Sequence, residues 1–228
     1  WSNFNASSAS NGTVGLNIKD IKIKPTDPNT LYAVSSNRFY KSVDGGESFT
    51  LVTGGLPFNG ISRMVIDVTP ANPDVVYVLL SDNSYGFRGV YKSSNAGVNF
   101  TQVASLANNG DIFESTQSWY DLAFAVSDTD ENEIYTGVLN IWKGNVTGSQ
   151  TNFTKVNNWN APFSSSYSHA DIHFLRFFNG DLYAGTDGGF YKSQNKGISF
   201  TDLTAGMQIS QFYRVAVSKQ SSNKMVGG

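Results

Sequence analysis

One short segment occurs three times in this chain, and its repetition constrains the fold more than any other feature of the sequence. The copies read YKSVDGGESF from Tyr40, YKSSNAGVNF from Tyr91 and YKSQNKGISF from Tyr191. Their closing residues are Phe49, Phe100 and Phe200, and Phe153 in GSQTNFTKV lies between the last two, where the rest of the segment is missing. A period of about 50 residues indicates a repeat architecture in which each unit is a small supersecondary structure.

Each unit carries the pattern of four short strands. An alternating apolar run such as IKIKP is followed by a turn rich in Pro, Asp and Asn, a strand with a central tyrosine, a strand such as RFYKS, and the repeated segment. The four central tyrosines are Tyr32, Tyr77, Tyr135 and Tyr183. We expect a fourth strand to begin at the closing phenylalanine of each unit. Four-stranded units at this spacing predict an all-β chain folded as a β-propeller.

The predicted blades divide the chain into six ranges. We expect four complete blades, in the ranges 17–57, 61–106, 119–158 and 169–206. We also expect partial blades at the two ends, in the ranges 1–16 and 211–228. We favour a segment of a larger propeller. The alternative is a five-bladed ring in which the strand of Trp1 joins the terminal half-blade.

The repeated segment has the pattern Ser-x-Asp-x-Gly-x-x-Phe, with Asn in place of Asp in two copies. Its positions are Ser42, Asp44, Gly46 and Phe49; Ser93, Asn95, Gly97 and Phe100; and Ser193, Asn195, Gly197 and Phe200. The Asp or Asn oxygen can accept backbone N–H groups in a tight loop, and glycine supplies a positive φ. We expect the serine hydroxyl to tie the loop to the neighbouring strand, and the phenylalanine to pack between sheets. These roles predict a structural corner rather than a catalytic element.

This pattern resembles the Asp-box, or bacterial neuraminidase repeat, of sialidases, sortilin-type receptors and xyloglucanases. The segment from His169 to Ser218 is also similar to a blade of secreted type IX pathway proteins of gliding and oral bacteria. The resemblance implies a secreted or cell-surface protein and implies no particular reaction. A sialidase is disfavoured because the Arg-Ile-Pro element of that family is absent from the sequence.

Composition excludes several classes of partner and site. The net charge is −2 with lysines and arginines scattered singly, which argues against a nucleic-acid partner. No apolar run approaches the roughly 20 residues of a membrane span. The absence of cysteine excludes a disulfide framework.

His169, Asp171 and His173 are spaced two residues apart, and on a strand they would share one face. On a first strand this face would line the propeller channel. Two imidazoles and a carboxylate could bind a divalent metal, although a hydrogen-bonded polar lining is the favoured interpretation and no cofactor is otherwise expected.

Two functional hypotheses remain open. The first is a binding or scaffolding propeller whose ligand is a glycan, a peptide or a neighbouring domain. Its candidate contacts are aromatic and imidazole side chains in or beside the long connection after the blade of Tyr135, or just before a first strand, namely Trp119, Tyr120, Trp159, Tyr167, His169 and His173, with Phe163 nearby. The alternative is a xyloglucanase-like glycoside hydrolase with Asp121 and Asp171 as the carboxylate pair.

Overall fold

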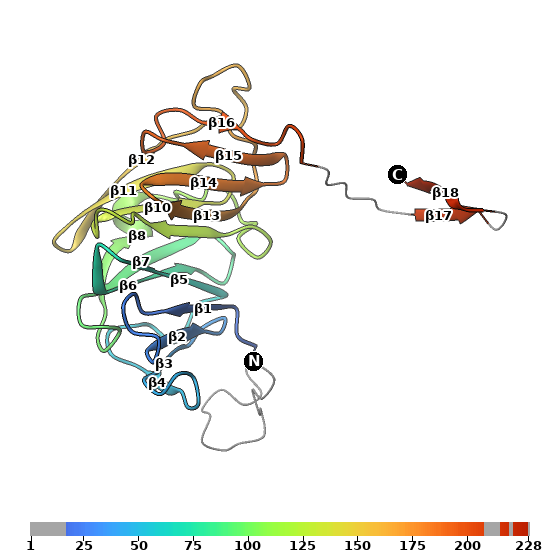
Figure 1. Ribbon diagram of the computed structural model, residues 1–228. Helices are drawn as coiled ribbons and strands as arrows, with labels where there is room; N and C mark the ends of the chain where they lie inside the picture. Colours follow the sequence, from blue (N-terminus) through green and yellow to red (C-terminus); the bar gives the residue numbers. More distant parts are fainter. Residues whose placement is uncertain (1–16, 208–214, 219–220, 228) are drawn as a thin grey trace.

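The computed structural model describes residues 17–207, 215–218 and 221–227, and it is built from antiparallel sheets (Figure 1). Blade one consists of β1 (Asp20–Ile23), β2 (Leu31–Val34), β3 (Phe39–Ser42) and β4 (Thr50–Val52). Blade two consists of β5 (Arg63–Thr69), β6 (Asn72–Ser81), β7 (Phe87–Ser93) and β8 (Thr101–Ser105). Blade three consists of β9 (Ala123–Val126), β10 (Glu133–Gly137), β11 (Ile141–Thr147) and β12 (Gln150–Lys155). Blade four consists of β13 (Ile172–Phe178), β14 (Asp181–Thr186), β15 (Gly189–Ser193) and β16 (Thr201–Asp202).

The strands of each blade pair in chain order, so every blade is a simple antiparallel meander. A two-stranded sheet of β17 (Val215–Ser218) and β18 (Ser221–Gly227) follows. The one helix among the described residues is the short α1 (Leu106–Asn109). The predicted all-β propeller of four-stranded blades is therefore confirmed as a partial propeller; the expected partial blade at residues 1–16 lies outside the described residues. No helix in the described ranges has the length and apolar character to cross a membrane.

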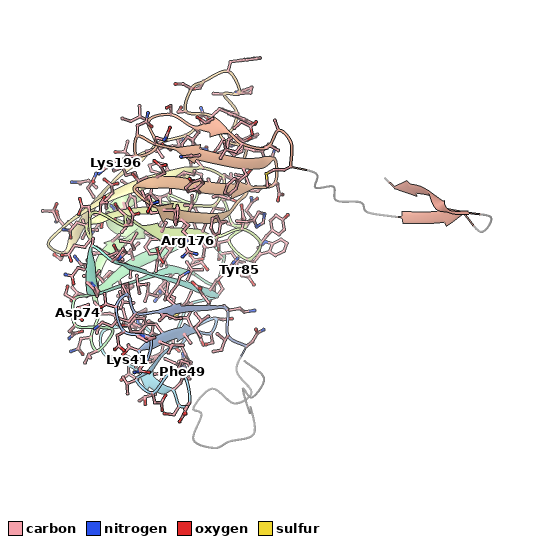
Figure 2. All side chains as sticks on the ribbon, viewed as in Figure 1. Lys41, Phe49, Asp74, Tyr85, Arg176 and Lys196 are labelled. Atoms are coloured by element: carbon pink, nitrogen blue, oxygen red, sulfur yellow. The ribbon has the colours of Figure 1, made fainter. Side chains whose placement is uncertain are left out.

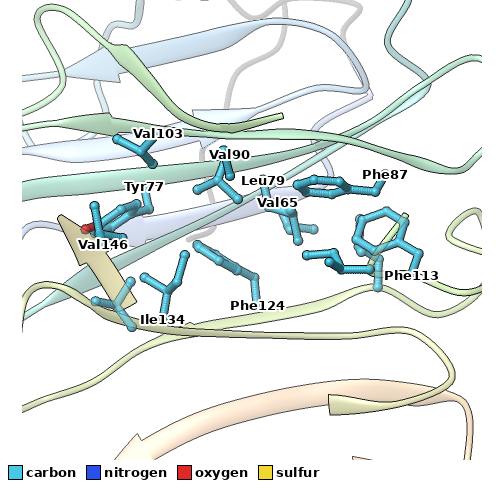
Figure 3. Packing of buried hydrophobic residues seen from close by; sticks show 14 of the residues in the cluster. Val65, Tyr77, Leu79, Phe87, Val90, Val103, Phe113, Phe124, Ile134 and Val146 are labelled. Atoms are coloured by element: carbon cyan, nitrogen blue, oxygen red, sulfur yellow. The ribbon is translucent and has the colours of Figure 1, made fainter. Parts of the chain in front are cut away.

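The cores lie between successive blades, as stacking of two-faced sheets requires. One apolar cluster joins blades one and two, a second joins blades two and three, and a third joins blades three and four. Figure 3 shows the second, in which Tyr77, Leu79 and Phe87 of blade two pack toward Phe124 and Ile134 of blade three. The second-strand tyrosines of blades one to three, Tyr32, Tyr77 and Tyr135, are fully buried at 0% exposure.

The three repeated segments close with the same hydrogen bonds. In the second copy the Ser93 hydroxyl donates to Asn95 Oδ1 at 2.9 Å and accepts from the Gly97 N–H at 3.0 Å, and Asn95 Oδ1 accepts from the Asn99 N–H at 3.0 Å. The equivalent bonds occur around Ser42 and around Ser193. The serine is the last residue of the third strand in each copy, so its hydroxyl ties the loop to the strand that precedes it, as expected.

The closing phenylalanine of blade two packs between blades as expected, with the Phe100 ring 4.9 Å from the Phe39 ring of blade one. The fourth strands begin one residue after Phe49, Phe100 and Phe200, not at them. In blade three the expectation fails by more, because a tight hairpin at Gly148 replaces the loop and β12 begins three residues before Phe153.

Aspartates of the inner region join each blade to the next. Asp20 accepts from the Ile66 N–H of blade two at 3.0 Å, and Asp67 accepts from the Val126 N–H of blade three at 2.8 Å. Asp128, just after β9, accepts from the Gly180 N–H of blade four at 2.9 Å. Each contact gives a backbone donor of one blade an acceptor on the previous blade, which fixes the first strands side by side.

The meander gives every blade two different ends. The turns between strands one and two and the repeated segments lie at one end, which we call the box end. The turns between strands two and three and the connections between blades lie at the other, the loop end. Figure 2 accordingly shows Tyr85 of the β6–β7 turn on the opposite side of the molecule from Asp74 and Lys196.

Candidate functional site at the loop end

The long connection between blades two and three, residues 106–122, is anchored by a buried aromatic. Phe113 is 1% exposed, and its ring lies 5.4 Å from that of Phe87 in an edge-on contact. The end of the same connection projects Trp119 and Tyr120 outward, with 63% and 46% of their surface exposed. Ser118 between them and the anchor is fully buried, and its hydroxyl donates to the Tyr85 carbonyl at 2.7 Å. The contacts of Phe113 and Ser118 therefore fix the backbone from which the Trp119 and Tyr120 rings project into solvent.

Tyr120 contacts two residues of blade four. Its hydroxyl donates to the Asp187 carboxylate at 3.0 Å, and its ring lies edge-on to the His173 imidazole at 4.7 Å. His173 Nε2 in turn lies 2.8 Å from Asp187 Oδ1. The hydrogen bond to the Asp187 carboxylate raises the pKa of the Tyr120 hydroxyl, because it favours the protonated phenol. These three side chains and Trp119 form one cluster, the loop-end cluster.

The two predicted catalytic aspartates lie close together just behind this cluster. The Gln117 side-chain amide donates to Asp121 Oδ2 at 2.9 Å and also to Asp171 Oδ1. Carboxylates that share one donor nitrogen are within two hydrogen-bond lengths, about 6 Å. This separation is near the range used by retaining glycosidases.

Burial limits what this aspartate pair can do. Asp121 is 0% exposed, and its Oδ1 has no hydrogen-bond partner among the described residues. Burial raises the pKa of Asp121 to about 6, and the nearby Asp171 charge adds to the increase. Because Gln117 occupies the space between the carboxyl groups and Asp121 is sealed from solvent, a glycosidic bond cannot reach between them in this arrangement.

The expected strand alternation of His169, Asp171 and His173 was wrong. β13 begins only at Ile172, so His169 and Asp171 precede it, and Asp171 has a left-handed φ of 61°. The pairing register of β13 also shifts between Ile172 and Phe174. No group of three His, Cys, Asp or Glu side chains suited to a metal ion occurs within the described part of the chain, so these residues do not gather as a ligand set.

His169 and Tyr167 lie apart from the loop-end cluster. His169 is half-buried, and its Nδ1 lies 3.1 Å from the Ala170 carbonyl oxygen. Its ring rests on the backbone of Gly188, where any Cβ would collide with it. Tyr167 is also half-buried and packs against the core between blades three and four, 6.1 Å from the Tyr191 ring. His169 is thus held by packing on blade four, and Tyr167 by packing between blades three and four.

The connection between blades three and four also presents exposed rings at the loop end. Trp159 is 44% exposed and Phe163 is 101% exposed. The backbone N–H of Trp159 donates to Asn140 Oδ1 in the β10–β11 turn at 3.0 Å, and this bond ties the loop to the end of blade three. Tyr85, in the β6–β7 turn and 38% exposed, adds a further ring. The exposed tryptophans and tyrosines of the described chain are all at the loop end.

A cavity of about 800 Å³ opens along the first strands of the four blades, where a propeller has its channel. Its lining includes Lys22, Arg63, Asp67 and Arg176, together with His173 of the loop-end cluster. Burial raises the pKa of Asp67 to about 6. The cavity therefore leads from the channel to the cluster through a lining of mixed charge.

Gln117 and Tyr85 were absent from the sequence-based candidates. Gln117 lies in the polar run ESTQS, which has no periodicity, and only the folded connection brings its amide between two carboxylates. Tyr85 follows Asp-Asn-Ser in the β6–β7 turn, where turn chemistry is readable but exposure is not.

Comparison with known proteins supports the architecture alone. No protein-family model matches the chain, and no curated protein matches it. Among solved structures, the GH74 xyloglucanase from Xanthomonas campestris is similar with a TM-score of 0.62 and 18% identity, over 86% of this chain and 31% of that one. An ancestral GH74 enzyme has a TM-score of 0.55 and 16% identity over 90% of this chain and 28% of that one.

A structure of the nidogen/laminin complex is similar at a TM-score of 0.56 with 12% identity, over 82% of this chain and 64% of that one. The chain spans less than a third of the length of the two GH74 structures. At these identities the likeness extends to the fold and not to activity. The chain is thus a segment with the β-propeller fold, similar in architecture to several proteins of different function.

Proposed function

We propose that this chain is an extracellular binding segment of a larger propeller protein and that its loop end binds carbohydrate. The observation that carries the proposal is the gathering of exposed Trp119, Tyr120, Trp159 and Tyr85 at one end of the blades. Aromatic rings present flat apolar faces that suit the C–H faces of sugar rings. An extracellular location is supported by the resemblance to secreted propellers.

The polar members of the loop-end cluster supply hydrogen bonds of the kind that fix a sugar's orientation. Asp187 is an acceptor and His173 carries a ring nitrogen beside it, with 38% and 35% of their side chains exposed. A few placed polar groups beside aromatic surface are typical of small-molecule sites. The cavity along the first strands extends this surface inward.

Hydrolysis is not part of this proposal. A retaining or inverting glycosidase needs both carboxyl groups to reach the scissile bond. Asp121 is fully buried, and Gln117 bridges it to Asp171. Binding without bond cleavage is the activity that these residues support best.

The test is retention of the protein on a panel of immobilised glycans, followed by titration of the best glycan. Trp119→Ala should weaken binding by about tenfold or more, since truncating a tryptophan that anchors a binding surface costs about 2 kcal/mol or more. The matched control is Ile198→Ala, which removes a side chain that is 75% exposed at the box end and should leave affinity unchanged.

Two results would contradict the proposal. One is that no glycan of the panel retains the protein; the other is that Trp119→Ala and Ile198→Ala bind equally well. Release of reducing sugar from the bound glycan would instead favour the hydrolase alternative.

A further inference from the structure

The outer face of blade four differs from the equivalent faces of the other blades. Each second strand places its tyrosine on the face toward the following blade, and in blades one to three that tyrosine is fully buried. Tyr183 occupies this position in blade four, where it is only half-buried. Among the described residues the equivalent packing partner for Tyr183 is therefore missing.

The same face carries further aromatic rings. Phe174 and Phe178 of β13 are 44% and 62% exposed, and the Tyr183 and Phe190 rings stack with centroids 5.8 Å apart. Tyr183 pairs with Arg176 across β13 and β14, and in blade three the equivalent position is the buried Ala125. Four aromatic rings on one sheet face form a surface of the kind that marks an interface.

After blade four the chain continues with two further strands, and the connection to them has a length suited to joining neighbouring blades. Twelve residues separate Asp202, which ends β16, from Val215, which begins β17. The connection from β4 to β5 has ten residues and that from β12 to β13 has sixteen, so this connection lies within the range that already joins neighbouring blades. β17 and β18 are also antiparallel, as the first two strands of every blade are.

The register of this hairpin identifies which of its faces would meet blade four. Val217 pairs with Met225, and Ala216 pairs with Val226. The sequence KMVGG matches DLYAG of blade four, which puts Val226 at the tyrosine position that faces onward. Positions 215, 217 and 225 then fall on the opposite face, equivalent to the face by which β13 and β14 meet blade three.

We propose that the aromatic face of blade four is the docking surface for β17 and β18, which form the first two strands of a fifth blade. β17 and β18 form a sheet of their own, and docking places this sheet on blade four face to face without pairing its strands to those of blade four. Docking removes Phe174, Phe178 and the Tyr183–Phe190 stack from water by the contact that already buries Tyr32, Tyr77 and Tyr135. This inference is independent of carbohydrate binding.

The test is chemical footprinting of the full chain with a reagent that labels exposed phenylalanine. Phe163, which is 101% exposed, serves as the internal standard. We expect Phe178 to be labelled much less than Phe163 in the parent protein. Val217→Asp should raise Phe178 labelling about threefold or more, because a charge on the docking face opposes burial.

The matched control is Val226→Asp, which alters the opposite face of the hairpin by register and should leave Phe178 protected. Phe39, Phe124 and Phe177 are buried in the three cores between successive blades, and their unchanged protection in both variants would show that blades one to four remain folded. Equal labelling of Phe178 and Phe163 in the parent would overturn the proposal. So would equal effects of the two substitutions, or protection that depends on protein concentration, which would indicate a second copy as the occupant.

Discussion

At the box end, a few side chains close each loop through hydrogen bonds, and single substitutions can test these bonds. Ser93 is 1% exposed, and its hydroxyl both donates to Asn95 and accepts from the buried Gly97 N–H. An Asn amide and an Asp carboxylate make the equivalent bonds in different copies. The network therefore depends on an acceptor oxygen and not on a negative charge.

Ser93→Ala should lower the free energy of unfolding by about 1–3 kcal/mol, because it leaves a buried backbone N–H without an acceptor. Urea denaturation would measure the loss. Ser94→Ala is the adjacent control, since Ser94 is exposed and should change stability by only a few tenths. Equal losses for the two variants would contradict the role given to the Ser93 hydroxyl.

The buried Asp121 makes stability depend on pH in a predictable direction. Its pKa is raised to about 6 in the folded chain from an ordinary value of 3.8. Between these values the folded protein keeps the proton and the unfolded chain releases it, so the wild type loses stability as pH rises through this window. Above pH 6 the full penalty of the buried charge is present.

Asp121→Asn removes this penalty while keeping the side-chain shape. The variant should match the wild type near pH 4 and exceed its unfolding free energy by about 1–2 kcal/mol at pH 7, given 1.36 kcal/mol per pKa unit and partial relaxation. Parallel urea titrations across this pH range would measure the difference. A stability difference that stays constant with pH would show that the Asp121 charge is not the cause.

At the scale of elements, the blades are joined by loops as well as by sheet faces. Gly97 has a φ of 73°, and a Cβ there would lie 3.0 Å from the Tyr32 ring of the preceding blade. Gly46 has a similarly left-handed φ of 92°, but a Cβ there would meet only ordinary contacts, the nearest at 3.6 Å. The two glycines thus share a left-handed backbone, which strains any replacement, and they differ in packing.

Gly46→Ala should cost about 1–2 kcal/mol of unfolding free energy from the left-handed backbone. Gly97→Ala should cost that amount and a further 1–3 kcal/mol, roughly, from overpacking against blade one. Thermal or urea unfolding of both variants would give the difference. Equal losses would mean that the loop of blade two does not pack tightly on blade one.

The elements that could be predicted from the sequence are those set by local chemistry. The strand of each tyrosine, the turns rich in Pro and Asp, and the loops with Ser, Asn and Gly all follow from nearby residues. Phe153 misled the placement of β12, because the hairpin at Gly148 lets pairing start at Gln150, opposite Thr147. Where the repeated loop is missing, as in blade three, the fourth strand begins earlier even though Phe153 is present.

The candidate site could be predicted only in part. Trp119 and Tyr120 were found because they are aromatic residues just before a predicted first strand. The bridge from Gln117 to Asp121 and Asp171 depends on two connections that meet in space, and Asp171 leaves the strand pattern through its left-handed φ. Such contacts have no sequence period. The alternating pattern therefore predicted Asp171 within a strand, whereas β13 begins one residue later, at Ile172.

At the scale of the whole molecule, the blade ends have different chemistry. The box end carries the three hydrogen-bonded loops, and the loop end carries the exposed tryptophans and tyrosines with His173 and Asp187. Because antiparallel meanders always return their inter-blade connections to the same end, loops from different blades converge there. The box end therefore has a structural role, and the loop end carries the proposed carbohydrate site.

The most direct test of a carbohydrate site at the loop end is an NMR titration of the ¹⁵N-labelled protein with a glycan that binds it on the panel. We expect the indole N–H signals of Trp119 and Trp159 to shift, and that of Trp142, which is half-buried in β11, to stay unchanged. Shifts confined to Trp142, or to backbone amides of the box-end loops around Ser42, Ser93 and Ser193, would contradict a carbohydrate site at the loop end.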